Sequence, residues 1–145
     1  MLIMLMCKLQ IDALAYLHIE KLAHFQYTMN LPQTGNRIVD LTFEFSLKII
    51  RFIDVLEEQK KYVIARQLIK SGTSIGANIR EAQNCESKAD FIHKFKISAK
   101  EAEETEYWLL LCKYSANYPF DESLLEKLIE IKKIITKIIH SAKTK

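Results

Sequence analysis

Acidic residues and a histidine at helical spacing are the first side chains that could do chemistry. Glu101 and Glu104 lie three residues apart, and Asp90 precedes His93 by the same interval. Residues three apart share one face of a helix, and di-iron bundles use two Glu-x-x-His motifs with further inward-facing glutamates. Asp90-x-x-His93 is the one acid-x-x-His match in the chain, so the second histidine motif is missing. We therefore predict no metal site.

Serine and histidine residues do not form a nucleophile pair in this sequence. Ser71 and Ser74 fall within a helical pattern, without the strand-turn-helix elbow that presents a catalytic serine. The four histidines are scattered, and no glycine motif for phosphates or dinucleotides occurs. We predict that the protein is not an enzyme and holds no cofactor. The alternative is an enzyme whose metal site is not apparent in the sequence.

Basic residues form small clusters that could contact phosphate groups. Lys48 and Arg51 are three residues apart in one predicted helix, and Lys132, Lys133 and Lys137 lie in another. We predict these five residues as the nucleic-acid-binding set. In a monomer, ordinary solubilising charge explains them equally well. In a ring of identical subunits each cluster is repeated, and phosphate contacts add up in affinity.

The overall charge permits nucleic-acid binding without demanding it. The chain has a net charge of +3 and a pI of about 8.7, which is less basic than most dedicated binders. No alternation of aromatic and basic residues of the single-strand-binding kind is visible. We expect binding to structured or double-stranded nucleic acid, by charge and with weak sequence preference.

The elements that carry these residues are helices, and two of them form a hairpin across residues 62–115. Gly72 and Gly76 lie one turn apart, and each costs ~1 kcal/mol against alanine in a helix. Close approach of a neighbouring backbone would explain them. A polar stripe at helical spacing runs beside the apolar one, and we expect its serines and asparagine to be buried and hydrogen-bonded between helices. Its members are Gln67, Ser71, Ser74, Asn78 and Glu81.

The second helix of the hairpin begins at an N-cap motif, Ser87 followed by Asp90. Its heptad-like seam must run antiparallel to the first helix, because the connection near residues 84–86 is short. In the register that we infer, Ser71 lies opposite Glu101 and Gln67 opposite Thr105. Ion pairs between the two helices are then expected from Arg66 and Lys70 to Glu101 and Glu104.

Three segments of this hairpin resemble a known family. SIGANIREAQ, ESKADFIHKFKIS and EAEETEYWLL resemble the four-helix-bundle proteins encoded in intervening sequences of bacterial 23S ribosomal RNA genes. They are also similar to accessory proteins of diversity-generating retroelements. The likeness covers residues 30–145, although many ribosomal-RNA members have Gly-Ser where this chain has Glu101-Ala102. The resemblance implies a homopentamer with nucleic-acid binding and no established catalysis.

Composition and periodicity predict the same fold class independently. The chain has 145 residues, 49% of them hydrophobic, with three glycines and two prolines, which favours helices. We expect helices at 37–58, 62–84, 88–115 and 122–141, and hence an all-α antiparallel four-helix bundle. The first has a core stripe with a second apolar row beside it. The stripe is Leu41, Phe45, Ile49, Phe52 and Leu56, and the row is Phe43, Leu47 and Ile50.

The last predicted helix has more apolar residues than one bundle face can bury. Surplus apolar surface on a helix usually meets another subunit, so we expect a homo-oligomer. The nine residues are Leu124, Leu125, Leu128, Ile129, Ile131, Ile134, Ile135, Ile138 and Ile139.

Residues 1–28 form an N-terminal extension to the predicted bundle domain, residues 29–145. The apolar run at residues 1–7 is too short for a membrane span and has no basic residue before it, as a signal peptide requires. The extension is either an additional helical segment or the result of a start codon placed too early. We therefore expect no membrane association. Three cysteines without CxxC spacing fit a reducing cytoplasm.

Three functions of different classes follow from these observations. The first is a non-catalytic oligomer that binds ribosomal RNA or another duplex. The second is an accessory subunit whose partner is a retroelement reverse transcriptase. The third is the enzyme whose metal site is not apparent in the sequence. A protein that binds no nucleic acid is better interpreted as a protein–protein interaction scaffold.

Overall fold

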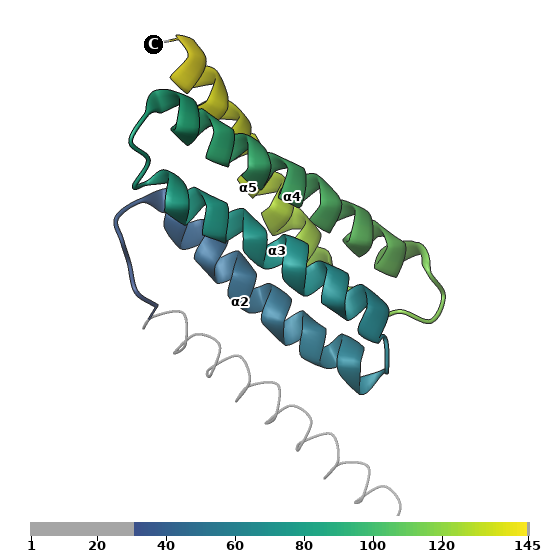
Figure 1. Ribbon diagram of the computed structural model, residues 1–145. Helices are drawn as coiled ribbons and strands as arrows, with labels where there is room; N and C mark the ends of the chain where they lie inside the picture. Colours follow the sequence, from purple (N-terminus) through teal and green to yellow (C-terminus); the bar gives the residue numbers. More distant parts are fainter. Residues whose placement is uncertain (1–30, 145) are drawn as a thin grey trace, which may run out of the picture. The chain divides into compact units, whose positions relative to one another are not determined.

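The computed structural model describes residues 31–144, and these form an antiparallel four-helix bundle (Figure 1). Its helices are α2 (Arg37–Glu58), α3 (Tyr62–Ala82), α4 (Lys88–Tyr114) and α5 (Glu122–Thr144). Each helix packs against the next one in the chain, and α5 closes the bundle against α2. The all-α class and the bundle predicted from the sequence are confirmed. None of the described helices is long and apolar enough to cross a membrane.

The helix bounds predicted from the sequence agree with the structure to within two residues, except at the C-terminal end of α5. The bounds predicted for α2 are correct, and Ser87 caps α4 by accepting a hydrogen bond from the Asp90 N–H at 3.1 Å. α3 ends two residues early, since the Gln83 N–H bonds to Arg80 O three residues back and tightens the turn. α5 continues to Thr144, because no glycine or proline follows residue 141 to stop it. The predicted extension at residues 1–28 and the domain boundary lie outside the described residues.

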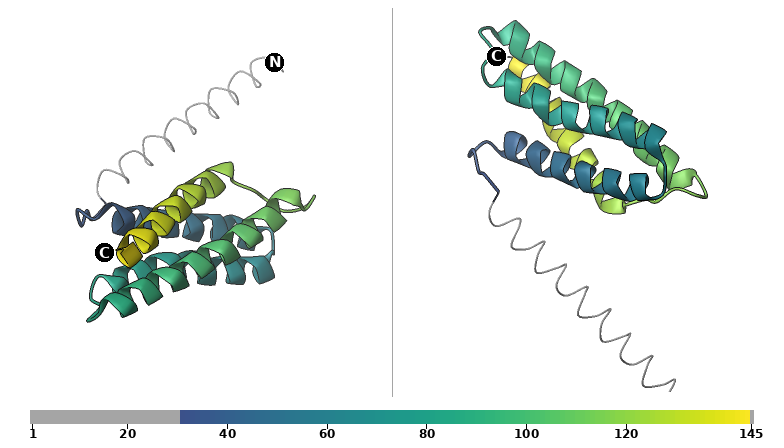
Figure 2. Two further views of the ribbon diagram at one scale, coloured as in Figure 1. Left: turned by 90° about the horizontal axis from the view of Figure 1, so that it is seen from above. Right: turned by 60° about the horizontal axis from the view of Figure 1, so that its bottom comes forward.

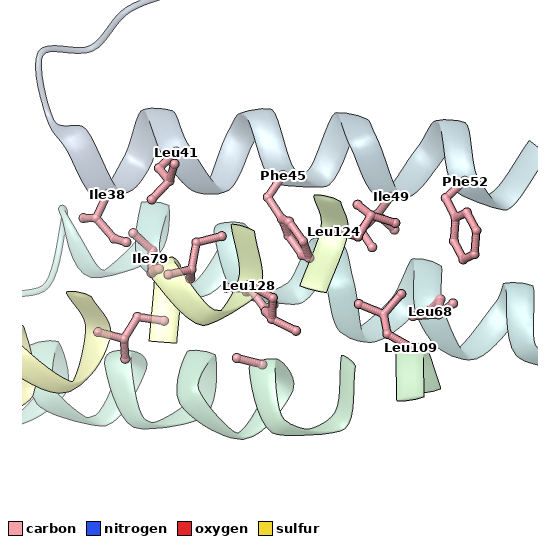
Figure 3. Packing of buried hydrophobic residues seen from close by; sticks show 14 of the residues in the cluster. Ile38, Leu41, Phe45, Ile49, Phe52, Leu68, Ile79, Leu109, Leu124 and Leu128 are labelled. Atoms are coloured by element: carbon pink, nitrogen blue, oxygen red, sulfur yellow. The ribbon is translucent and has the colours of Figure 1, made fainter. Parts of the chain in front are cut away.

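The core lies along the bundle axis, where large side chains from all four helices meet (Figure 3). Phe45, Ile49, Leu56, Leu68, Leu109, Leu124 and Leu128 are among those completely buried. The predicted core stripe of α2 is therefore confirmed. Views from other directions show α5 running beside α4 and crossing α2 obliquely (Figure 2).

The expected surplus of apolar surface on α5 is largely absent. Five of its nine apolar residues are buried, three are half-buried, and Ile129 alone is 40% exposed. The bundle therefore does not bury all nine, as predicted, but the surplus is smaller than expected because α5 packs against two neighbours, α2 and α4. Exposed apolar side chains lie elsewhere: Ile50, Val55, Tyr62, Val63, Tyr107, Leu111 and Tyr114.

Gly72 and Gly76 face α2, and each permits a different close contact. A Cβ atom at Gly76 would lie 3.3 Å from Thr42 O, so this glycine does allow a neighbouring backbone to approach. At Gly72 the Cβ atom would lie 2.9 Å from Cγ1 of Ile49, so there the close neighbour is a side chain. At both glycines, α3 therefore packs closely against α2.

Candidate nucleic-acid interface

The contact between α3 and α4 is made of small polar side chains. The hydroxyls of Ser71 and Thr105 are both buried and lie 3.0 Å apart. Ser71 donates to Gln67 O at 3.0 Å, and the Thr105 hydroxyl also lies 2.7 Å from Glu101 O. Ser71 therefore lies opposite Thr105, and the register predicted from the sequence is wrong by about one helical turn. Heptad spacing repeats along the helix, so it does not distinguish between registers that differ by a turn.

The rest of the polar stripe is only partly between helices. Ser74 and Asn78 are half-buried, and they hydrogen-bond backbone carbonyls of their own helix at 2.7 and 2.8 Å. Gln67 is half-buried, whereas Glu81 is exposed and forms an ion pair with Lys94 at 2.7 Å. Of the stripe, Ser71 and Glu81 bond side chains of α4, Ser71 inside the interface and Glu81 at its exposed edge. Both contacts hold the two helices together, which is a structural role.

The ion pairs expected from Arg66 and Lys70 to Glu101 and Glu104 are not among those formed by residues 31–144. The shifted register places the two basic residues about one turn further along α4. Arg66 instead bonds Tyr62 O at 3.4 Å. Partial burial raises the pKa of Glu101, and the Glu104 carboxylate raises it further, while Lys70 lowers it from a distance.

We expect the substitution Glu101→Gln to stabilise the protein at pH 7. A carboxyl whose pKa is raised by folding contributes stability below its unfolded pKa of about 4.3, and that contribution is lost as the pH rises through the folded pKa. The gain from the substitution should therefore appear above that range and vanish near pH 3.5. Urea unfolding at several pH values checks this. Glu126→Gln on the exposed face of α5 is the matched control, and an equal effect from it would contradict the explanation.

Lys132 is held in place by two glutamates of α4. Its Nζ atom lies 2.9 Å from Glu103 Oε1 and also donates to Glu106 Oε2. Burial lowers the pKa of Lys132, but the bonds to Glu106 and Glu103 outweigh burial and raise it overall. This lysine, predicted to contact nucleic acid, is thus already neutralised and joins α5 to α4. The sequence could not show this because the two glutamates lie 26 and 29 residues away.

Lys133 and Lys137 remain exposed, one turn apart on α5. They line an open hollow of about 480 Å³ between α4 and α5, together with Ile129, Thr136 and the side chains of Glu106 and Lys132. Neither lysine takes part in an ion pair within residues 31–144. Their charges are therefore available to an anion in this hollow.

Lys48 and Arg51 lie on α2 and are not brought together with the α5 lysines. Arg37, at the start of α2, pairs with Glu130 of α5 at 2.9 Å. Lys48 lies three turns further along α2, and the antiparallel packing carries it toward the opposite end of α5. Lys48 is also half-buried. The five predicted binding residues therefore do not form one surface.

Comparison with known proteins identifies the family. The family model described as 23S rRNA-intervening sequence protein matches residues 35–137, which is more than half of the chain. The chain belongs to this family. The resemblance of its hairpin segments is thereby confirmed.

A solved structure supports this membership. A protein of unknown function from the S23 ribosomal protein family of Bacteroides thetaiotaomicron is 44% identical, with a TM-score of 0.63. The match covers 70% of this chain and 97% of that one. No curated protein matches.

Metal-ligating groups, buried polar atoms and thiols are the remaining features of this family member's described residues that bear on chemistry. Between residues 31 and 144, no group of three or more His, Cys, Asp or Glu residues is close enough to hold a metal ion. Every buried side-chain polar atom in that range has a hydrogen-bond partner. The two described cysteines are both free thiols: burial raises the pKa of Cys112, and a bond to Asp90 raises that of Cys85.

Proposed function

We propose that this intervening-sequence family member is a non-catalytic homo-oligomer that binds nucleic-acid phosphates through lysines of α5 and α4. The observation that carries the proposal is the exposed pair Lys133 and Lys137 at the open hollow, with no acidic partner among the described residues. A lysine whose charge is not neutralised by a carboxylate is free to displace counterions from a phosphate backbone.

Two lysines of α4 extend this surface. Lys132 pairs with Glu103, which fixes how antiparallel α4 and α5 lie against each other. Moving from that pair toward the C-terminus of α5 therefore means moving toward the N-terminus of α4. Lys96 and Lys100 lie in this direction on α4, and both are exposed. They form no ion pair within the described residues. The lysine face is defined as Lys96, Lys100, Lys133 and Lys137.

Self-association would repeat the lysine face once for each subunit. Four exposed apolar side chains lie on α2 and at the start of α3, on helices that carry none of the lysine face: Ile50, Val55, Tyr62 and Val63. Exposed apolar side chains favour contact with another subunit. Five subunits are expected from the family resemblance alone. A ring would present five copies of a face that is weak singly, because linked contacts add up in avidity.

Binding should depend on salt more than on sequence. Lysines are point charges that contact phosphates without reading bases. Each phosphate contact that is removed should lower the slope of log affinity against log salt by about one. The double substitution Lys133→Gln and Lys137→Gln should therefore weaken binding of a short RNA duplex and reduce that slope by about two for each subunit in contact. Fluorescence anisotropy at several salt concentrations measures both quantities.

The matched control is Arg66→Gln with Lys70→Gln, which removes the same charge from α3. This helix lies diagonally across the bundle from α5 and does not contact it. An equal loss of affinity in the control would mean that only net charge matters. If the purified protein binds no RNA or DNA duplex even at low salt, the proposal is wrong, and a protein–protein scaffold becomes the better interpretation.

A further inference from the structure

The outer face of α4 carries an aromatic row that the bundle does not use. Tyr107, Leu111 and Tyr114 follow one another at intervals of four and three, so they share one side of the helix. Tyr107 is 57% exposed and Tyr114 is 80% exposed. The buried seam of α4, with Leu109 and Cys112, lies on the opposite side. An aromatic ring contributes binding free energy when its apolar faces are buried, so this row could bind a ligand that has an apolar face.

The aromatic row continues into the lysine face. Lys100, Tyr107 and Tyr114 are spaced seven residues apart, which is two helical turns and about 10.5 Å along the axis. Lys96 lies one turn beyond Lys100 on the same exposed side. Along this face of α4, Lys96 and Lys100 are followed by Tyr107 and Tyr114, so cationic side chains adjoin aromatic ones. This grouping is not evident in the linear sequence, because most residues between them belong to other faces of the helix.

We infer that this face of α4 binds unpaired nucleotides adjoining a duplex, with bases stacked on Tyr107 and Tyr114 and backbone phosphates held by Lys96 and Lys100. The inference rests on the proposed nucleic-acid binding and specifies its ligand. Aromatic side chains are the usual platform for splayed-out bases, and they tolerate any base because each has a π-face. Two tyrosines two turns apart suit bases that are not stacked on each other.

The carboxylates near Tyr107 do not prevent this. Glu103 and Glu106 share Lys132, which offsets one of their two negative charges. Glu104 accepts a hydrogen bond from Nε1 of Trp108 at 3.3 Å. The repulsion that a phosphate would meet beside Tyr107 is therefore weaker than the count of acidic residues suggests.

The size of the row favours nucleic acid over a protein partner. Its three side chains expose roughly 300–400 Å² together, given the area of an aromatic side chain. A stable protein interface needs about 800 Å² on each side. Lysines adjoin the row, whereas protein interfaces are depleted in lysine. A nucleotide strand needs less area and uses those charges.

The chain contains one tryptophan, and it reports on this face. Trp108 contacts Tyr107 edge-on, with ring centroids 5.1 Å apart. A base that stacks on Tyr107 changes the surroundings of the indole. Quenching of Trp108 fluorescence therefore distinguishes stacking from contact with phosphates alone.

The test compares a blunt RNA duplex with the same duplex carrying a six-nucleotide single-stranded overhang. We expect the wild-type protein to bind the overhang probe roughly tenfold or more tightly, because each stacked base adds about that much. Only the overhang probe should quench Trp108. The double substitution Tyr107→Ala and Tyr114→Ala should abolish the preference and leave affinity for the blunt duplex unchanged. Tyr107→Phe with Tyr114→Phe, the matched control, should keep it because phenylalanine still stacks.

The outcomes separate this inference from the proposed function. If neither probe binds, both are wrong. If the blunt duplex binds with the expected salt dependence but the overhang adds no affinity, only the inference fails. If the alanine variant has a different subunit number by light scattering, the aromatic row is a contact between subunits, and the inference is overturned.

Discussion

Replacing Phe45 with alanine should lower the free energy of unfolding by about 3–5 kcal/mol, the usual loss for a buried aromatic side chain in a core that cannot collapse. Phe45 is completely buried where α2 meets the other helices (Figure 3). A domain of this size has only about 5–15 kcal/mol of stability in total, so this loss is large. Chemical denaturation at one fixed protein concentration measures it.

Phe43 provides the matched control on the same helix. It is half-buried and lines a shallow hollow of about 250 Å³ between α2 and α3. Its replacement by alanine should cost about 1 kcal/mol, as for a partly exposed position. If the two substitutions destabilise the protein equally, the assignment of Phe45 to the core and Phe43 to its edge is wrong.

Replacing Gly72 with leucine should lower the free energy of unfolding by about 2 kcal/mol or more. A leucine gains up to ~1 kcal/mol of helix propensity over glycine. Overpacking outweighs that gain, because the Cβ atom alone would lie 2.9 Å from Cγ1 of the fully buried Ile49. Gly76→Ala is the control. Its Cβ atom meets Thr42 O at 3.3 Å, and we expect a change close to zero.

A double-mutant cycle tests the cause of this loss. Ile49→Ala alone should destabilise the protein by leaving a cavity. Combined with Gly72→Leu, it removes the side chain that the leucine would strike. The two changes should therefore cost at least about 1 kcal/mol less together than the sum of the single changes. Simple additivity would show that Gly72 is required for another reason.

The sequence predicted the elements of this bundle well because each is specified locally. Apolar periodicity and short polar connections gave the bounds of α2, and the N-cap motif at Ser87 located the start of α4. Close packing was also predicted from local features, since Gly72 and Gly76 have no reason to lie in a solvated helix. Helix type, order and approximate length therefore followed from nearest neighbours along the chain.

The pairing of side chains between helices could not be predicted in the same way. Ser71 was placed opposite Glu101, yet it meets Thr105, because a helical pattern is nearly unchanged when it slides by one turn. Lys132 was assigned to a ligand, although Glu103 and Glu106 neutralise it. The row formed by Tyr107 and Tyr114 was missed, since its exposure depends on which side of α4 the bundle covers. Charge and exposure are properties of packed faces rather than of spacing.

The order in which helices meet has a consequence for how this chain reaches its folded state. Three of the four helix–helix contacts join consecutive helices, and α3 with α4 makes the most extensive one. Contacts between neighbours along a chain need little loop-closure entropy and form quickly. The contact between α2 and α5 is different, since Arg37 and Glu130, which are paired there, lie 93 residues apart. Closing that interface therefore has the largest loop-closure cost of the four.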